Sequence, residues 1–323
     1  MTKTNVTVGI AGAGTMGASM CQIFAEYGYQ VILYTRREKT LNYAKDIIHL
    51  NQETKVKCGD ITSEEAEKTL SNITYAKPGD LNCFKECGLI IESIVEDLNA
   101  KHIFWKEVSS LVSEDAILTT NTSGLSITEI AKAIKKPERF CGMHWFNPPH
   151  IIPLIEVISG EETNRKTAEK VYEISEKIGK KPIYVAKDAP GFIANRIQLA
   201  ILRECLHIKK CGIGDYEDID RCMKYGLGFR YACLGPMEVC DQGGLDTFYH
   251  ISSYLFKDLA DDKDPDDTIL GELIKKGEYG VKTKKGFYDY SNGKDEKAIQ
   301  ARDEMYLAMA KADVTSIGEK EGI

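Results

Sequence analysis

The stretch Val8-Gly9-Ile10-Ala11-Gly12-Ala13-Gly14-Thr15-Met16-Gly17 decides the fold that we expect for this chain. It begins as an apolar strand and leads into a helix-like segment, residues 18–27, which is followed by a second apolar strand at residues 30–34. A Gly-x-Gly-x-x-Gly spacing in a strand–turn–helix–strand setting is typical of dinucleotide-binding folds. The sequence therefore predicts a bound dinucleotide near its N-terminal end.

The three glycines of this loop have separate tasks. Gly12 is expected to make the tight turn, Gly14 to let the backbone approach a pyrophosphate, and Gly17 to let the helix pack closely on the strand. The N-terminus of the helix offers free N–H groups and a positive dipole end to the phosphates. We therefore expect the cofactor to be bound by Gly12, Gly14, Thr15, Met16 and Gly17.

Length, charge and cysteine content narrow the class of protein. A chain of 323 residues can form two domains, and its net charge of -7 disfavours a nucleic-acid binder, whose surface is usually basic. The ten cysteines are scattered, and Cys83 and Cys87 lack a second pair or a His at zinc-ligand spacing, so we expect no metal site. Without a signal-peptide core or an apolar run of about 20 residues, we expect a cytoplasmic protein that binds no membrane.

Strand-like and helical segments alternate along the first part of the chain, which predicts an α/β domain with a Rossmann-like, doubly wound parallel sheet. Helix-capping patterns occur at Thr62-x-x-Glu65 and Ser126-x-x-Glu129. Further strands are expected at residues 73–76, 88–94, 116–120, 140–145 and 183–186, helices at residues 38–50, 101–111 and 165–178, and a polar segment at residues 51–60.

The pattern changes at Asp188-Ala189-Pro190-Gly191, after which strand-like runs give way to helical periodicity. We therefore expect a dinucleotide-binding domain at residues 1–189 and a smaller all-helical domain at residues 190–323. Small helical domains of this kind often dimerise, so a homodimer is expected through this domain. Its helices are expected at residues 193–210, 216–225, 237–259 and 293–312.

Four polar residues stand out as candidates for chemistry. Ser123 follows the strand at residues 116–120, and His144 ends the strand at residues 140–145. Both should emerge at the carboxyl edge of the sheet, where ligands bind in open α/β folds. Glu156 lies in an apolar run and needs a partner, for which His144 is the natural candidate, because a buried carboxylate is costly when unpaired. A His oriented by a carboxylate can act as a general acid or base. The fourth candidate is Asn195.

The ordered motifs of this chain resemble those of the L-3-hydroxyacyl-CoA dehydrogenases over nearly its whole length. The segments that carry the resemblance are the glycine loop, Thr120-Asn121-Thr122-Ser123, Gly142-Met143-His144-Trp145-Phe146-Asn147-Pro148, Glu156, Gly191-Phe192-Ile193-Ala194-Asn195-Arg196, Gly235-Pro236-Met237-Glu238 and Gly286-Phe287-Tyr288-Asp289-Tyr290. The resemblance implies an NAD(P)-dependent oxidoreductase of short-chain 3-hydroxyacyl-CoA, of the 3-hydroxybutyryl-CoA type.

By this resemblance, His144 is the base that takes the 3-hydroxyl proton, and Glu156 orients it and stabilises its protonated form. Ser123 and Asn195 are implied to hydrogen-bond the reacting oxygens of the substrate. The positions that match cofactor contacts of the family are Glu96, Lys101, Asn147 and Lys282.

Two departures from the family pattern leave the cofactor and the substrate open. After the second strand, Thr35 stands where NAD enzymes of this fold usually have an acidic residue, and Arg36 and Arg37 follow it. Loss of the carboxylate and gain of guanidinium groups favour NADP, whose 2′-phosphate an Arg can bind. The alternative is a pair of solvated arginines in an enzyme that uses NAD.

The second departure is residues 226–236, which lack the usual His-Pro step and, with Asn147-Pro148-Pro149-His150, resemble the λ-crystallin (L-gulonate dehydrogenase) and carnitine dehydrogenase branch. Those enzymes act on free 3-hydroxy acids, and Arg230 is then a candidate for binding a free carboxylate. A salt bridge at a domain interface is the alternative role for Arg230. A third reading is a non-catalytic, dinucleotide-binding protein of the lens-crystallin kind.

Overall fold

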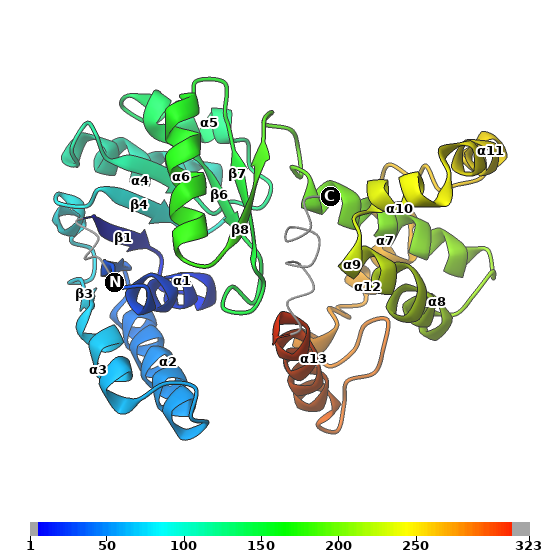
Figure 1. The fold of residues 1–323 in the computed structure, drawn as a ribbon, viewed down its shortest axis with the longest axis horizontal. Coiled ribbons are helices and arrows are strands. Elements are labelled where there is room, and N and C mark those ends of the chain that lie inside the picture. The colour runs from blue at the N-terminus through cyan, green and yellow to red at the C-terminus, as the bar shows by residue number, and fades with distance from the viewer. Residues whose placement is uncertain (1–5, 312–323) are drawn as a thin grey trace. The chain divides into compact units, whose positions relative to one another are not determined.

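The structure is a computed structural model that describes residues 6–311. These residues form two compact units, with the boundary between Asn195 and Arg196. The first unit is built on one eight-stranded sheet with the order β3-β2-β1-β4-β5-β6-β7-β8 (Figure 1). All neighbouring strands are parallel except β6 and β7. The doubly wound, mostly parallel sheet predicted from the sequence is therefore confirmed. Its strands are β1 (Thr7–Ala11), β2 (Gln30–Tyr34), β3 (Ile73–Tyr75), β4 (Leu89–Glu92), β5 (Ile117–Thr120), β6 (Phe140–Trp145), β7 (Leu154–Ile158) and β8 (Lys181–Val185).

Helices cover both faces of this sheet (Figure 1). One face is covered by α1 (Thr15–Glu26), α2 (Glu38–Lys57), α3 (Ser63–Ser71) and α6 (Arg165–Lys177), and the other by α4 (Leu98–Leu111), α5 (Ile127–Ala131) and the 3-10 helix η1 (Leu81–Phe84). The 3-10 helix η2 (Pro137–Arg139) precedes β6. Successive strand residues alternate between the two cores, since Leu89 and Ile91 belong to one and Ile90 to the other.

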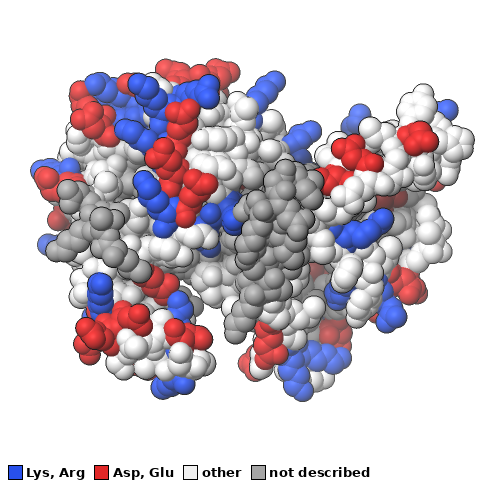
Figure 2. All heavy atoms as spheres, in the orientation of Figure 1, with Lys and Arg blue, Asp and Glu red and all other residues white. Residues whose placement is uncertain are grey.

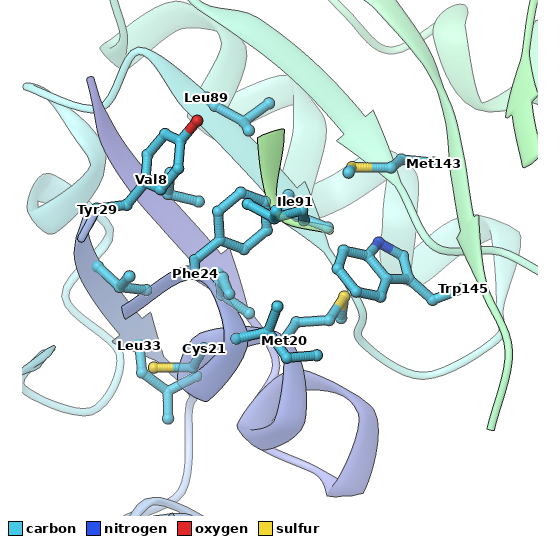
Figure 3. Packing of buried hydrophobic residues seen from close by; sticks show 14 of the residues in the cluster. Val8, Met20, Cys21, Phe24, Tyr29, Leu33, Leu89, Ile91, Met143 and Trp145 are labelled. Carbon is cyan, nitrogen blue, oxygen red and sulfur yellow. The ribbon is translucent and has the colours of Figure 1, made fainter. Parts of the chain in front are cut away.

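The core under α1 is centred on Phe24, which is fully buried (Figure 3). Its ring packs edge-on against Tyr29 at a centroid distance of 5.3 Å and lies 6.1 Å from the ring of Trp145 on β6. Burying a side chain of this size contributes about 2–3 kcal/mol. This packing fixes the helix that follows the glycine loop against the strand that carries His144.

One sequence prediction for this unit is wrong, and one strand was missed. Residues 51–57 continue α2 rather than forming a polar connection, because their polar side chains pack against α1: Gln52 and Lys55 both bind Glu26, at 2.8 and 2.6 Å. The strand β7 was not expected at all. The helix caps at Thr62 and Ser126 are confirmed, since each hydroxyl accepts the N–H of the residue three positions later.

The second unit is helical, as predicted. Its described part has no strand and only the isolated bridges Gly280–Lys285 and Lys285–Asp289. The helix expected at residues 237–259 is two helices, because the backbone turns at Gly244 (φ +91°). Residue 312, expected to end the last helix, lies outside the described residues. The elements are α7 (Ala194–Lys210), α8 (Tyr216–Cys222), the π-helical turn η3 (Met223–Leu227), α9 (Gly228–Cys233), α10 (Pro236–Gly243), α11 (Leu245–Leu255), η4 (Pro265–Asp267), α12 (Ile269–Lys275), η5 (Val281–Thr283) and α13 (Lys294–Lys311).

Charged side chains of both signs are interspersed on the face shown in Figure 2. Several form exposed pairs one helical turn apart, such as Arg165 with Glu169 on α6 at 2.8 Å. Among residues 6–311, none of the helices is apolar enough over a sufficient length to cross a membrane.

Candidate active site

The glycine loop between β1 and α1 has the shape that a pyrophosphate requires. Gly12 adopts φ +113°, and a Cβ there would lie 2.2 Å from the carbonyl oxygen of Ser93. A Cβ at Gly17 would lie 1.7 Å from the oxygen of Gly12, so the helix can approach the strand only with glycine there. A Cβ at Gly14 would instead point into open space, with no described atom within 4 Å.

The first turn of α1 is also suited to an anion. Its N-cap is Gly14, which has no side chain to accept the free N–H groups of the turn. No acidic residue lies in that turn, so nothing in it competes with a phosphate for the positive end of the helix dipole. The residues present therefore fit the phosphates of a dinucleotide.

The strand register brings the predicted site residues to the same edge of the sheet. Ala11 pairs with Glu92, Glu92 with Thr120, and Thr120 with Gly142. The glycine loop after β1, the turn with Ser123 after β5, and His144 near the end of β6 therefore all lie at the carboxyl edge, where α/β folds bind their ligands.

His144 and Glu156 face each other across the antiparallel pair β6–β7. They are register partners, and the Nδ1 atom of His144 lies 2.8 Å from the Oε2 atom of Glu156. Both side chains are buried, and the partner expected for the buried carboxylate is the one found. Since an ionised carboxylate can only accept, Nδ1 is the donor in this contact, and in a neutral imidazole with this tautomer Nε2 is the acceptor.

The other oxygen of Glu156 is bound by the start of α7. Its Oε1 atom accepts the backbone N–H groups of Ile193 and Ala194, at 3.0 and 2.9 Å. Burial alone would raise the pKa of Glu156, but the hydrogen bond from His144 and these two N–H groups hold it below its ordinary value. Glu156 therefore accepts hydrogen bonds on both oxygens, from His144 on one and from the start of α7 on the other.

Ser123 and Asn195 are also brought together. The side-chain amide of Asn195 donates to the carbonyl oxygen of Ser123 at 2.8 Å. The rings of Phe146 and Phe192 lie 4.6 and 5.8 Å from that of His144, between centroids. The site is therefore a buried His144–Glu156 pair flanked by two aromatic rings, at the carboxyl edge of the sheet.

A second cluster of charged residues at this edge was only partly foreseen. Lys101 is buried, and its Nζ atom lies 2.6 Å from Glu92 and 3.3 Å from Glu96. Lys101 and Glu96 were predicted to contact the cofactor, whereas Glu92 was not predicted as a site residue. The sequence does indicate Glu92, because it ends an apolar strand and a buried carboxylate there needs a partner, as Glu156 does.

The remaining predicted residues lie as follows. Thr35 is half-buried after β2, and Arg36 and Arg37 are exposed at the start of α2. Asn147 is exposed directly after β6. Arg230 on α9 and Lys282 in η5 are exposed and belong to the helical unit. Their roles toward cofactor or substrate stay predictions.

Comparison with known proteins identifies the family. Residues 7–189 match the model of the 3-hydroxyacyl-CoA dehydrogenase NAD binding domain, and residues 191–290 match that of the 3-hydroxyacyl-CoA dehydrogenase C-terminal domain. The chain therefore belongs to the 3-hydroxyacyl-CoA dehydrogenase family and is an oxidoreductase with an NAD-binding domain.

Individual relatives differ in substrate. The chain is 35% identical to a 5-formyl-3-hydroxy-2-methylpyridine 4-carboxylate 5-dehydrogenase of Mesorhizobium japonicum, covering 91% of this chain and 93% of that protein. It is 36% identical to a 3-hydroxybutyryl-CoA dehydrogenase of Clostridioides difficile, covering 87% and 98%. A crystal structure of the pyridine carboxylate dehydrogenase, described as an NAD+ dependent dismutase, superposes with a TM-score of 0.84 at 33% identity, covering 97% of this chain and 98% of that one.

Proposed function

We propose that this chain transfers a hydride between NAD(P) and C3 of a short-chain L-3-hydroxyacyl-CoA, of the 3-hydroxybutyryl-CoA/acetoacetyl-CoA type. The observation that carries the proposal is the 2.8 Å contact between His144 and Glu156 at the sheet edge that also carries the glycine loop. The similarity to the 3-hydroxybutyryl-CoA dehydrogenase of Clostridioides difficile supports the same substrate class.

In the proposed reaction three of the four residues, His144, Ser123 and Asn195, act on the substrate, and Glu156 acts through His144. The bound cofactor supplies the nicotinamide that accepts or donates the hydride. His144 removes the hydroxyl proton through Nε2, and Glu156 stabilises the imidazolium that results. The Ser123 hydroxyl and the Asn195 amide donate hydrogen bonds to substrate oxygens, on which negative charge develops during reduction of the ketone.

A second candidate substrate is a free 3-hydroxy acid of the L-gulonate or carnitine kind. The pyridine carboxylate dehydrogenase is named for a substrate that carries a free carboxylate, and its structure matches over 97% of this chain. An exposed Arg230 on α9 is then the candidate for binding the substrate carboxylate. In this alternative His144 and Glu156 have the same roles, and the substrate is a free acid instead of a CoA thioester.

For the cofactor, we propose a preference for NADP over NAD. The proposal rests on Thr35, Arg36 and Arg37 alone. The matching family model names NAD, and the pyridine carboxylate dehydrogenase is described as NAD+ dependent, so the comparisons lend NADP no support. In the structure, Arg36 and Arg37 lie at the β2–α2 connection, where this fold places the residue that meets the adenosine ribose.

The experiment is reduction of acetoacetyl-CoA and of free acetoacetate by the purified protein, each with NADH and with NADPH. We expect the highest kcat/KM for acetoacetyl-CoA with NADPH. Faster reduction of acetoacetate would favour the free-acid candidate, and faster reaction with NADH would overturn the NADP preference. Reduction of neither compound with either cofactor would contradict the proposed function.

A further inference from the structure

Glu92 is a fully buried carboxylate at the end of β4, next to the glycine loop in the sheet register. It accepts three hydrogen bonds: from the Nζ atom of Lys101 at 2.6 Å, the backbone N–H of Ile94 at 2.9 Å, and the hydroxyl of Thr120 at 2.8 Å. The three donors belong to α4, to the segment between β4 and α4, and to β5. Glu92 is therefore fixed, and it fixes the first turns of α4 against the sheet.

Lys101 joins Glu92 to a second carboxylate. Its side chain is 1% exposed, and its ammonium group lies 3.3 Å from Glu96, whose side chain is 46% exposed. Glu96 accepts the hydroxyl of Thr122 and, at 3.1 Å, the backbone N–H of Ser123. Burial alone would raise the pKa of Glu96, but the bond from Thr122 and the charge of Lys101 hold it below its ordinary value.

The Ser123 backbone is consequently held from two sides. Glu96 binds its N–H, and Asn195 binds its carbonyl oxygen at 2.8 Å. The turn that carries Ser123 thus depends on Glu96, Glu96 on Lys101, and Lys101 on Glu92. Removing one partner of a buried ion pair leaves an uncompensated charge, which disturbs whatever the other partner holds.

We propose that Glu92 is a positioning residue: it holds Lys101, and through Lys101 holds Glu96 against the backbone of Ser123. The proposal rests on the proposed function for the role of Ser123 as a donor to the substrate. Its structural part, the dependence of the Ser123 turn on Glu92, does not require any activity and can be measured separately.

Hydrogen–deuterium exchange tests that structural part on the full chain without added cofactor. In Glu92→Gln, amides of residues 121–125 should exchange roughly fivefold faster or more, since the acceptor of the Ser123 N–H is released. The matched control is Glu26→Gln. Glu26 also binds a lysine ammonium group, that of Lys55, at 2.6 Å, but it lies at the end of α1 away from the glycine loop. Exchange at residues 121–125 should therefore not change in this variant.

A double variant guards against unfolding caused by the loss of the buried partner of Lys101, which keeps only the half-exposed Glu96 at 3.3 Å. Glu92→Gln combined with Lys101→Met removes both charges, and such replacements usually leave stability close to that of the original pair. It should keep the sheet amides protected while residues 121–125 still exchange faster. Protection of these residues as in the wild type, in the single or the double variant, would overturn the proposal.

Kinetics test the functional part. The kcat of Glu92→Gln should fall by roughly 10–100-fold, the usual cost of removing a group that orients a site residue, while that of Glu26→Gln stays within about twofold of wild type. If Glu92 acts through Lys101, the double variant should be no slower than Lys101→Met alone. Losses that multiply, or an unchanged kcat in Glu92→Gln, would contradict the inference. An inactive wild type would contradict the proposed function instead, and the exchange result would still decide the structural part.

Discussion

One carboxylate, Glu156, connects His144 to the start of α7. Its Oε2 atom orients His144 on β6, and its Oε1 atom binds the N–H groups of Ile193 and Ala194, which open α7. The same end of α7 carries Asn195, whose side-chain amide donates to the carbonyl oxygen of Ser123. A change at Glu156 should therefore be felt in the stability of the site as well as in its chemistry.

Glu156→Gln should lose stability in a pH-dependent way. Because the folded-state pKa of Glu156 is below the ordinary value of 4.5, its contribution is fully present above that value and is lost as the pH falls through the lowered pKa. The wild type should exceed the variant by about 1–3 kcal/mol near neutral pH. Chemical denaturation at a series of pH values measures this, and a stability difference that does not shrink below pH 4.5 would contradict it.

The residues of the site were predictable to different degrees. Glu156 was predictable because an apolar run surrounds it, and a buried carboxylate needs a partner, which in the structure is His144. Glu92 follows the same rule but was overlooked, since its partner Lys101 is nine residues away on a helix whose burial the sequence does not reveal. The bond from Asn195 to the Ser123 backbone was not predictable, because nothing local in the sequence relates the two positions.

Among the elements, β7 shows what periodicity alone misses. Its residues were seen only as an apolar run around Glu156, yet the connection from β6 is residues 146–153. So short a connection cannot hold a crossover helix, which is why β7 pairs antiparallel and places Glu156 opposite His144. The length of α2 was missed for another reason: its polar last turns are stabilised by contacts with Glu26, which are tertiary.

The β2–α2 connection carries a prediction for cofactor choice. Combined Arg36→Ala and Arg37→Ala should raise the Kd for NADPH by roughly 10–100-fold, the value of one or two charge-assisted hydrogen bonds, and that for NADH by less than about threefold. Cofactor fluorescence titration measures both constants. Arg165→Ala, which changes an exposed guanidinium on α6, is the control. Equal weakening of both cofactors would remove the 2′-phosphate assignment.

At the scale of the whole molecule, the helical unit exposes many large apolar side chains. Met237, Tyr249 and Phe256 are 75%, 78% and 72% exposed, and α8, α9 and α11 have no buried residue. Exposed apolar surface of this extent is typical of a chain that associates. The sequence predicted the helices, but how much of their surface stays uncovered became visible only in the structure.

We expect a homodimer that forms through this unit, as its sequence suggested. Light scattering coupled to gel filtration should give twice the chain mass of 36.1 kDa. Tyr249→Asp on α11 should shift the protein toward the monomer, whereas Tyr43→Asp, on α2 of the sheet unit and 55% exposed, should not. A monomer at all concentrations, or equal behaviour of the two variants, would contradict the prediction.

The acid–base role of His144 is tested by the turnover and cofactor affinity of His144→Ala, with His102→Ala as a control. His102 lies on α4, and its Nε2 atom is hydrogen-bonded to the carbonyl oxygen of Glu129 at 2.7 Å. We predict that His144→Ala lowers kcat by about 10²–10⁴, as loss of a general base does, with cofactor Kd close to wild type. His102→Ala should keep both. Full turnover in His144→Ala, or a collapse of cofactor binding together with activity, would contradict an acid–base role for His144.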